Sequence, residues 1–291
     1  MSNVKAVDDV TFSVNKGEIF TLAGESGCGK TTTGRLIVRL LKPTSGTVYF
    51  NGEDITKLEG EKLRLLRRKM QIIFQDPYAS LNPRMRLGDA VGHPLEIHGL
   101  ATGEEKQKLV LDVLDKVGLS PPEQFIDLFP HQLSGGQRQR AALARSIILK
   151  PEFIVADEPV SMIDVSLRTT IIDLMLGFRK ELGLTYLFIT HDLAVAKYIS
   201  DRIAIMYLGK IIEMGSKERL FLNPMHPYTQ ALLSAIPVPD PKRRRKMIEL
   251  KGEVPSAINI PSGCRFHPRC PYKKDECAEK EPRLIEVEKD H

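Results

Sequence analysis

The chain has 291 residues, of which 42% are hydrophobic, 27% charged and 6% aromatic, and this composition excludes disordered, collagen-like and small disulfide-stapled proteins. A net charge of +5 is too mild to favour binding of nucleic acid through bulk charge. No apolar run approaches the roughly 20 residues that span a bilayer, and no apolar signal core follows Met1. We therefore expect a soluble cytoplasmic α/β protein with one large domain or two ordinary ones.

Strands, turns and one helix are predicted in the first sixty residues. Val10–Val14 alternates between apolar and polar residues, and Ile19–Ala23 is an apolar run typical of a buried strand. A glycine-rich loop follows, and then a helix whose apolar face is predicted to extend to Leu41, just before Lys42-Pro43. Residues 47–52 indicate a further strand that is closed by a turn.

The middle of the chain reads differently. Residues 61–150 are mostly helical in pattern, and the block from about 78 to 150 is predicted to be a helical insertion. Strand patterns at 153–156, 186–190 and 203–208 then resume, with a helical pattern at 166–181 between the first two. Strands separated by helices usually pair in parallel, so we expect a mainly parallel sheet covered by helices.

The composition becomes proline-rich after Gly215, where the α/β pattern stops. Such a change marks a domain boundary, which we place near residue 216. We therefore predict one domain at residues 1–215 and a C-terminal extension at 216–291.

One segment matches the phosphate-loop pattern G-x4-G-K-[ST], and it reads Gly24-Glu25-Ser26-Gly27-Cys28-Gly29-Lys30-Thr31. Its glycines let successive backbone N–H groups turn inward around phosphate oxygens, and the helix that follows presents its N-terminus to the anion. We predict that Lys30 reaches the β- and γ-phosphates, that Thr31 binds Mg²⁺, and that Thr32 continues the site into the helix. Cys28 is expected to be a small filler residue.

A second motif, a pair of acidic residues, follows the buried strand pattern Phe153–Ala156. That strand delivers Asp157 to the carboxyl edge of the sheet, where a carboxylate can hold Mg²⁺ or its water. Glu158 comes next and is placed to activate an attacking water as a general base. An apolar strand that ends in two acidic residues is common by itself. It indicates a nucleotide site because the same chain also contains the phosphate loop.

The sequence Leu133-Ser134-Gly135-Gly136-Gln137 opens another helix, at Gln137 to Lys150. A hydroxyl and two glycines at a helix start form an anion site, although a Ser residue that only caps the helix is the ordinary alternative. One chain thus has two phosphate-binding helix starts. A head-to-tail dimer would bring both to one nucleotide, because each chain would offer Ser134 to the nucleotide on the other's Lys30.

Taken together, these motifs resemble the ATP-binding subunit of an ABC transporter, and the resemblance covers nearly the whole chain. It implies a P-loop ATPase fold of the ABC type with a parallel sheet core, an antiparallel β subdomain, a helical insertion and an irregular C-terminal extension. It also implies ATP and Mg²⁺ as cofactors. By resemblance Gln75 contacts Mg²⁺ and the attacking water, His191 binds the γ-phosphate and holds Glu158, and Asp164 lies in the dimer contact loop.

Two stretches of the extension narrow this resemblance. Residues 223–233 (NPMHPYTQALL) and 263–271 (GCRFHPRCP) are similar to the extension of oligopeptide/dipeptide-permease ATPases. Import of peptides or a related solute is thereby implied, with two membrane permease subunits, a second ATPase subunit (identical or a paralogue) and an extracytoplasmic solute-binding protein as partners. The protein would then lie at the cytoplasmic face of the inner membrane. The solute itself stays open.

Three cysteines of the extension, Cys264, Cys270 and Cys277, are separated by five and six residues, unlike the C-x2-C spacing of zinc ribbons. Extensions of this kind are similar to iron–sulfur sites, so a [4Fe–4S] cluster is the leading expectation, with a zinc site or free buried thiols as alternatives. A cluster needs four thiolates, and only three are present before His291. We therefore expect a fourth cysteine in a longer natural protein.

Further features leave alternatives open. No aromatic residue precedes Phe12, so the residue that stacks on adenine is not identified. Basic residues gather at Arg64, Arg67, Arg68 and Lys69 and again at Lys242–Lys246. They are expected to form a solvated face, with binding of anionic lipid headgroups as the main alternative and binding of nucleic acid as the least favoured one. The competing function is a non-transport ABC ATPase that acts on nucleic acid or ribosomes. We disfavour it because the chain has neither a second ATPase domain nor a long coiled-coil insertion.

Overall fold

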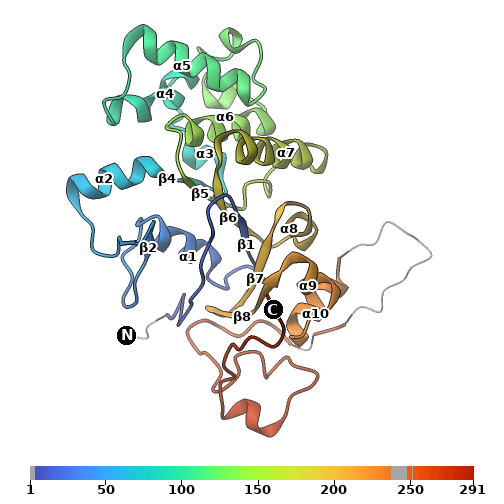
Figure 1. The fold of residues 1–291 in the computed structure, drawn as a ribbon. Coiled ribbons are helices and arrows are strands. Elements are labelled where there is room, and N and C mark those ends of the chain that lie inside the picture. Colours follow the sequence, from blue (N-terminus) through green and yellow to red (C-terminus); the bar gives the residue numbers. More distant parts are fainter. Residues whose placement is uncertain (1–3, 237–247, 251) are drawn as a thin grey trace. The chain divides into compact units, whose positions relative to one another are not determined.

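The computed structural model describes residues 4–236, 248–250 and 252–291 (Figure 1). Two compact units can be distinguished in it, and neither is continuous in sequence. The first consists of residues 1–14, 18–33 and 189–291, and the second of 15–17 and 34–188. The basic run Lys242–Lys246 lies outside the described residues.

In the first unit, strand β1 (Ile19–Ala23) pairs in parallel with β7 (Arg202–Tyr207), which pairs antiparallel with β8 (Lys210–Ser216). The sequence pattern does not predict β8, because its apolar and polar residues do not alternate regularly and most of them are only partly buried. The helices of this unit include α8 (Leu193–Ile199), α9 (Lys217–Leu222) and α10 (Pro227–Ser234).

In the second unit, β4 (Met70–Ile73) pairs in parallel with β5 (Phe153–Asp157), and β6 (Thr185–Thr190) is next in the strand order. A small antiparallel pair is formed by β2 (Tyr49–Phe50) and β3 (Glu53–Asp54). The larger sheet is therefore mostly parallel, as the sequence predicts. The helices of the second unit are α2 (Gly60–Lys69), α3 (Pro77–Ser80), α4 (Leu87–Ile97), α5 (Gly103–Lys116), α6 (Gly135–Ile147) and α7 (Val165–Leu182).

Two local predictions were wrong. Val10–Val14 forms no strand, and the ring of Phe12 instead stacks on Phe20 with 4.9 Å between centroids. Helix α1 (Lys30–Ile37) ends before Leu40 and Leu41, which are exposed. The reason is Arg39, whose φ of +57° ends the helix while its Nε donates to the carbonyl oxygen of Ile55 at 2.9 Å.

The C-terminal extension is irregular beyond α10, and the red segment of Figure 1 contains one short 3-10 turn at Asp275–Ala278. Its attachment depends on three aromatic residues that are all buried: Tyr207 of β7, Tyr228 of α10 and Phe266. Their ring centroids lie 4.8 to 5.4 Å apart in edge-on arrangements. Such pairs add stability beyond the burial of their area, so the extension shares a core with the sheet of its unit.

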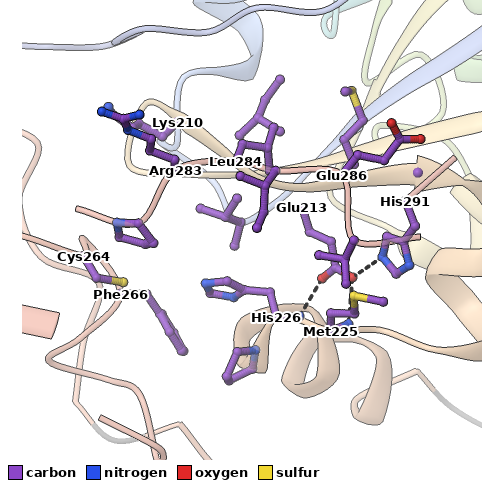
Figure 2. A pocket seen from close by; sticks show the side chains of 18 of the residues that line it. Lys210, Glu213, Met225, His226, Cys264, Phe266, Arg283, Leu284, Glu286 and His291 are labelled. Carbon is purple, nitrogen blue, oxygen red and sulfur yellow. Dashed lines mark hydrogen bonds and ion pairs between the residues drawn. The ribbon is translucent and has the colours of Figure 1, made fainter. Parts of the chain in front are cut away.

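A second contact in the extension is centred on the buried carboxylate of Glu213 on β8. It accepts hydrogen bonds from the backbone N–H groups of Met225 at 2.8 Å and His226 at 3.0 Å, and it lies 2.7 Å from Nε2 of His291. Figure 2 shows these bonds beside a pocket. The pocket has a volume of about 600 Å³ and is lined by residues of β8, of the start of α10 and of the C-terminal segment 281–287, with Asp290 and His291. The carboxylate thus fixes the start of α10.

Glu158, directly after β5, has a φ of +47° and therefore lies in the left-handed region that side chains with a Cβ avoid. We predict that Glu158→Gly is more stable than Glu158→Ala by about 1 kcal/mol, because only glycine adopts this backbone without strain. The urea unfolding midpoint measures the difference. The same two changes at exposed Lys108, in the middle of α5, should reverse the order, and a Glu158→Ala variant at least as stable as Glu158→Gly would contradict the strain.

Helix α10 begins at His226, whose Nδ1 accepts the backbone N–H of Tyr228 at 3.1 Å. Burial lowers the pKa of His226 below its usual 6.5, although the nearby Glu213 charge opposes this shift. A depressed folded-state pKa means that its contribution to stability is complete above pH 6.5 and is lost as the pH falls through the folded value.

Protonated Nδ1 cannot accept the bond, so acid should cost about 1 kcal/mol of capping energy. We predict that His226→Asn, which keeps a cap acceptor that does not titrate, loses less stability than the wild type between pH 7 and pH 5. Thermal melting across this range measures it. Equal slopes for the two proteins would show that His226 does not cause the acid sensitivity.

Candidate functional site

The glycine-rich loop at residues 24–31 joins β1 to α1 in the first unit. Gly24, Gly27 and Gly29 have φ values of +152°, +80° and +107°. A Cβ on Gly24 would lie 2.2 Å from the carbonyl oxygen of Met206, and one on Gly29 would lie 2.2 Å from that of Ala6. Larger residues are therefore excluded from both positions, and the backbone can turn as a phosphate loop requires.

Lys30 opens helix α1, and its side chain is only 4% exposed. Its Nζ donates to the carbonyl oxygens of Gly24 at 2.8 Å and Glu25 at 2.9 Å, so the ammonium lies against the start of the loop. Cys28 is buried, and burial raises the pKa of its thiol even though Lys30 lies nearby. A protonated, buried thiol suits the expected packing role.

Glu25 receives two side chains of the C-terminal extension that sequence reasoning missed. Its backbone N–H donates to the hydroxyl oxygen of Tyr228 at 3.0 Å. Its carboxylate accepts two bonds from the Arg269 guanidinium, at 2.9 and 3.3 Å. The motifs at 223–233 and 263–271 point to the family of the extension, but nothing in their pattern indicates contact with a loop more than 200 residues earlier.

In the second unit, the parallel register that pairs Ile73 with Ala156 brings together the segments that follow β4 and β5. The amide Nε2 of Gln75 donates to the Glu158 carboxylate at 2.9 Å. Asp157, one residue earlier, is buried at the end of β5. Two of the predicted site residues, 83 positions apart, thus touch directly, and the amide holds one carboxylate oxygen in place.

Ser134 is the N-cap of α6 and forms a capping box with Gln137. The Ser134 hydroxyl accepts the backbone N–H of Gln137 at 3.3 Å, and the backbone N–H of Ser134 donates to Gln137 Oε1 at 2.8 Å. A Cβ on Gly136 would lie 2.8 Å from a methyl carbon of Leu167 in α7, whereas Gly135 has open space. The ordinary capping role is therefore present, and Ser134 remains exposed at the helix start.

The remaining predicted residues follow strand or loop ends. His191 is exposed directly after β6, and Asp192 caps α8 through bonds from the N–H groups of Ala194 and Val195. Asp164 is exposed at the N-cap of α7. Lys30, Thr31 and His191 belong to the first unit, whereas Gln75, Ser134, Asp157, Glu158 and Asp164 belong to the second.

The cysteines of the extension are free thiols, and the backbone N–H of Cys264 donates to the carbonyl oxygen of Cys277 at 2.8 Å. Burial, with smaller effects of Cys277 and Cys270, raises the pKa of the Cys264 thiol. Among residues 4–236, 248–250 and 252–291, no group of three or more His, Cys, Asp or Glu side chains is arranged to hold a metal ion. The structure therefore does not support the predicted iron–sulfur cluster.

The basic residues Arg64, Arg67, Arg68 and Lys69 lie on α2, which has no buried residue, and Arg64 there pairs with Glu61. In the part of the chain that the structure describes, no helix is both long and apolar enough to cross a membrane.

Comparison with known proteins agrees with this geometry. The family model described as ABC transporter matches residues 7–161, and the model described as oligopeptide/dipeptide transporter, C-terminal region, matches residues 212–277. A solved dimeric structure of the ATP-binding cassette MJ0796, in a post-hydrolysis state bound to ADP and Pi, has a TM-score of 0.67 and 33% identity. That match covers 73% of this chain and 90% of the solved one.

Several curated proteins are similar over nearly the full length. The putative oligopeptide transport ATP-binding protein YkfD of Bacillus subtilis is 51% identical over 98% of this chain and 87% of its own. The oligopeptide transport ATP-binding protein AppF of the same organism is 50% identical over 100% and 89%. The dipeptide transport ATP-binding protein DppF of Haemophilus influenzae is 48% identical over 97% and 85%. The chain therefore belongs to the ABC transporter family of ATP-binding proteins and carries the C-terminal region described for oligopeptide/dipeptide transporters.

Proposed function

We propose that this protein hydrolyses ATP to drive uptake of oligopeptides, dipeptides or a related solute through a membrane ABC importer. The observation that carries the proposal is the presence, in one chain, of a glycine-restricted loop with a buried Lys30 and a Gln75–Glu158 pair. The C-terminal match and the peptide-transport relatives support the choice of solute class.

Residues 24–32 hold the phosphates in this proposal, through the backbone N–H groups of the loop and the Lys30 ammonium. Thr31, Gln75 and Asp157 would hold Mg²⁺, because hydroxyl, amide and carboxylate oxygens are its preferred ligands. When bound, the metal offsets charge on the β- and γ-phosphates. An iron–sulfur cluster forms no part of the proposal, because the described cysteines are not arranged for one.

Glu158 is the general base that takes a proton from the attacking water. Its hydrogen bond from Gln75 fixes the carboxylate, and its backbone is strained at φ +47°. Strained conformations of this kind concentrate at functional sites. His191 is proposed to contact the γ-phosphate.

Two copies are proposed to sandwich the nucleotide, since the exposed start of α6 offers N–H groups and the Ser134 hydroxyl to an anion on another chain. Ser134, Gly135, Gly136 and Gln137 would contact the partner's nucleotide, and Asp164 would lie at the dimer contact. The solved MJ0796 structure is dimeric and bound to ADP and Pi, which supports the pairing of two copies. The second copy is either identical or a paralogue.

The proposed partners are two membrane permease subunits and, through them, an extracytoplasmic solute-binding protein, with the ATPase peripheral at the inner membrane's cytoplasmic face. We also propose that residues 1–215 form the ATPase domain, with the helical subdomain at about 78–150, and that 216–291 form the extension. The family matches at 7–161 and 212–277 support this division. Nothing in the comparisons favours action on nucleic acid or ribosomes.

Replacing the base tests the mechanism. We predict that Glu158→Gln lowers ATP hydrolysis at least about 100-fold, leaves MgATP affinity within about twofold, and accumulates an ATP-bound dimer. Phosphate release measures hydrolysis, a fluorescent ATP analogue measures affinity, and light scattering measures the dimer. The same chemical change at exposed Glu181 of α7 should leave hydrolysis unaltered. Hydrolysis at the wild-type rate by Glu158→Gln would show that Glu158 is not the base.

Uptake tests the solute class. In cells that lack the wild-type gene, we predict that expressing Glu158→Gln fails to restore uptake of labelled di- and oligopeptides, whereas Glu181→Gln restores it, because transport requires hydrolysis. Peptide uptake that continues unchanged in the deletion strain, while ATP hydrolysis by the purified protein is normal, would refute peptide import and leave the ATPase assignment intact.

A further inference from the structure

Glu25 of the glycine-rich loop is held by contacts at three of its groups. Its backbone N–H donates to Tyr228, its carbonyl oxygen accepts from Lys30, and its carboxylate pairs with Arg269. Two of these three partners come from the C-terminal extension. The residue beside the first glycine of the loop is therefore fixed mainly by a segment outside the motif.

Arg269 is the stronger of the two contacts from the extension. Its side chain is 8% exposed and that of Glu25 30%, so water screens the pair only partly. Burial disfavours the charge of Arg269, but its interactions with Glu25 and Tyr207 together outweigh burial and raise the pKa of the guanidinium above its ordinary value. Arg269 therefore stays charged, and its paired geometry neutralises the Glu25 carboxylate.

Tyr228 cannot move away from Glu25 without disturbing the core. Its ring packs against Tyr207 at 4.8 Å and Phe266 at 5.4 Å, and it is fully buried. Burial also raises the pKa of its phenol, so the hydroxyl keeps its proton. The extension thus presents a fixed hydroxyl to the backbone and a fixed cation to the side chain of one loop residue.

The charge of Glu25 makes this contact relevant to nucleotide binding. A carboxylate within a loop that binds a polyphosphate repels its own ligand unless a cation neutralises it. We propose that Arg269 is a positioning residue of the ATP site, which cancels the Glu25 charge and holds the loop in its binding conformation. This inference rests on the proposed assignment of residues 24–32 to ATP.

Arg265 provides a matched control from the same segment. It is also 8% exposed and pairs with Asp8, which is 27% exposed, and it bonds the carbonyl oxygen of Leu208. These partners lie outside the loop, so Arg265 anchors the extension without charging or neutralising residues 24–31. Arg265→Gln and Arg269→Gln therefore each remove an ion pair of a buried arginine of the extension, and only the pair of Arg269 includes a residue of the loop.

The experiment measures MgATP affinity of the full chain with a fluorescent ATP analogue, at low and at physiological salt, and in parallel KM and kcat of hydrolysis. We expect Arg269→Gln to weaken binding about five- to tenfold, less at higher salt, with KM raised and kcat nearly unchanged. Glu25→Gln/Arg269→Gln should bind within about twofold of the wild type, because both charges are gone. Arg265→Gln should bind as the wild type does.

Should Arg269→Gln fail to fold, Glu25→Gln alone decides. It leaves the Arg269 cation without its counter-charge beside the loop, so it should bind MgATP about two- to fivefold more tightly than the wild type. If Arg269 only stabilised the fold, the double variant would bind as weakly as Arg269→Gln, or Arg265→Gln would weaken binding equally. Either result overturns the inference. Lys30→Ala distinguishes a failure of the ATP-loop assignment from a failure of the proposed role of Arg269. Normal binding by Lys30→Ala refutes the ATP-loop assignment itself, whereas weak binding by Lys30→Ala with normal binding by Arg269→Gln refutes only the role of Arg269.

Discussion

One aromatic cluster, in which Tyr207, Tyr228 and Phe266 are all buried, holds the C-terminal extension against the sheet of the first unit. Tyr207 belongs to the strand that pairs with β1, and the other two rings belong to the extension. Because the glycine-rich loop leaves the end of β1, a segment fixed on β7 necessarily lies near that loop. The contacts of Tyr228 and Arg269 with Glu25 follow from this one packing arrangement.

In the second unit, the parallel pairing of β4 and β5 determines where the site residues lie. Parallel strands end at the same edge of a sheet, so residues that follow them meet even when they are far apart in sequence. Gln75 and Glu158 meet in this way, and neither needs a specialised loop to do so. The proposed base thus derives its position from sheet topology and its orientation from one amide.

The sequence predicted the features that depend on local pattern. The phosphate loop, the strand that delivers Asp157 and Glu158, and the capped start at Ser134 follow from glycine placement, apolar runs and helix capping. Prediction was wrong where a tertiary contact prevails over local pattern. Arg39 ends α1 early through its bond to Ile55, and Phe12 stacks on Phe20 instead of entering a strand. The Arg269–Glu25 pair spans 244 residues, and no periodicity or motif encodes it.

The proposed role of Arg269 requires that the extension is energetically coupled to the ATP site through Glu25. Coupling between two sites is reciprocal, so MgATP must stabilise the extension if the extension favours MgATP. Amide hydrogen exchange of the full chain, with and without MgATP, measures this directly. Coupling of this kind predicts slower exchange on MgATP binding in residues 263–272 as well as in 24–32. Protection of 24–32 with unchanged exchange at 263–272 would contradict it.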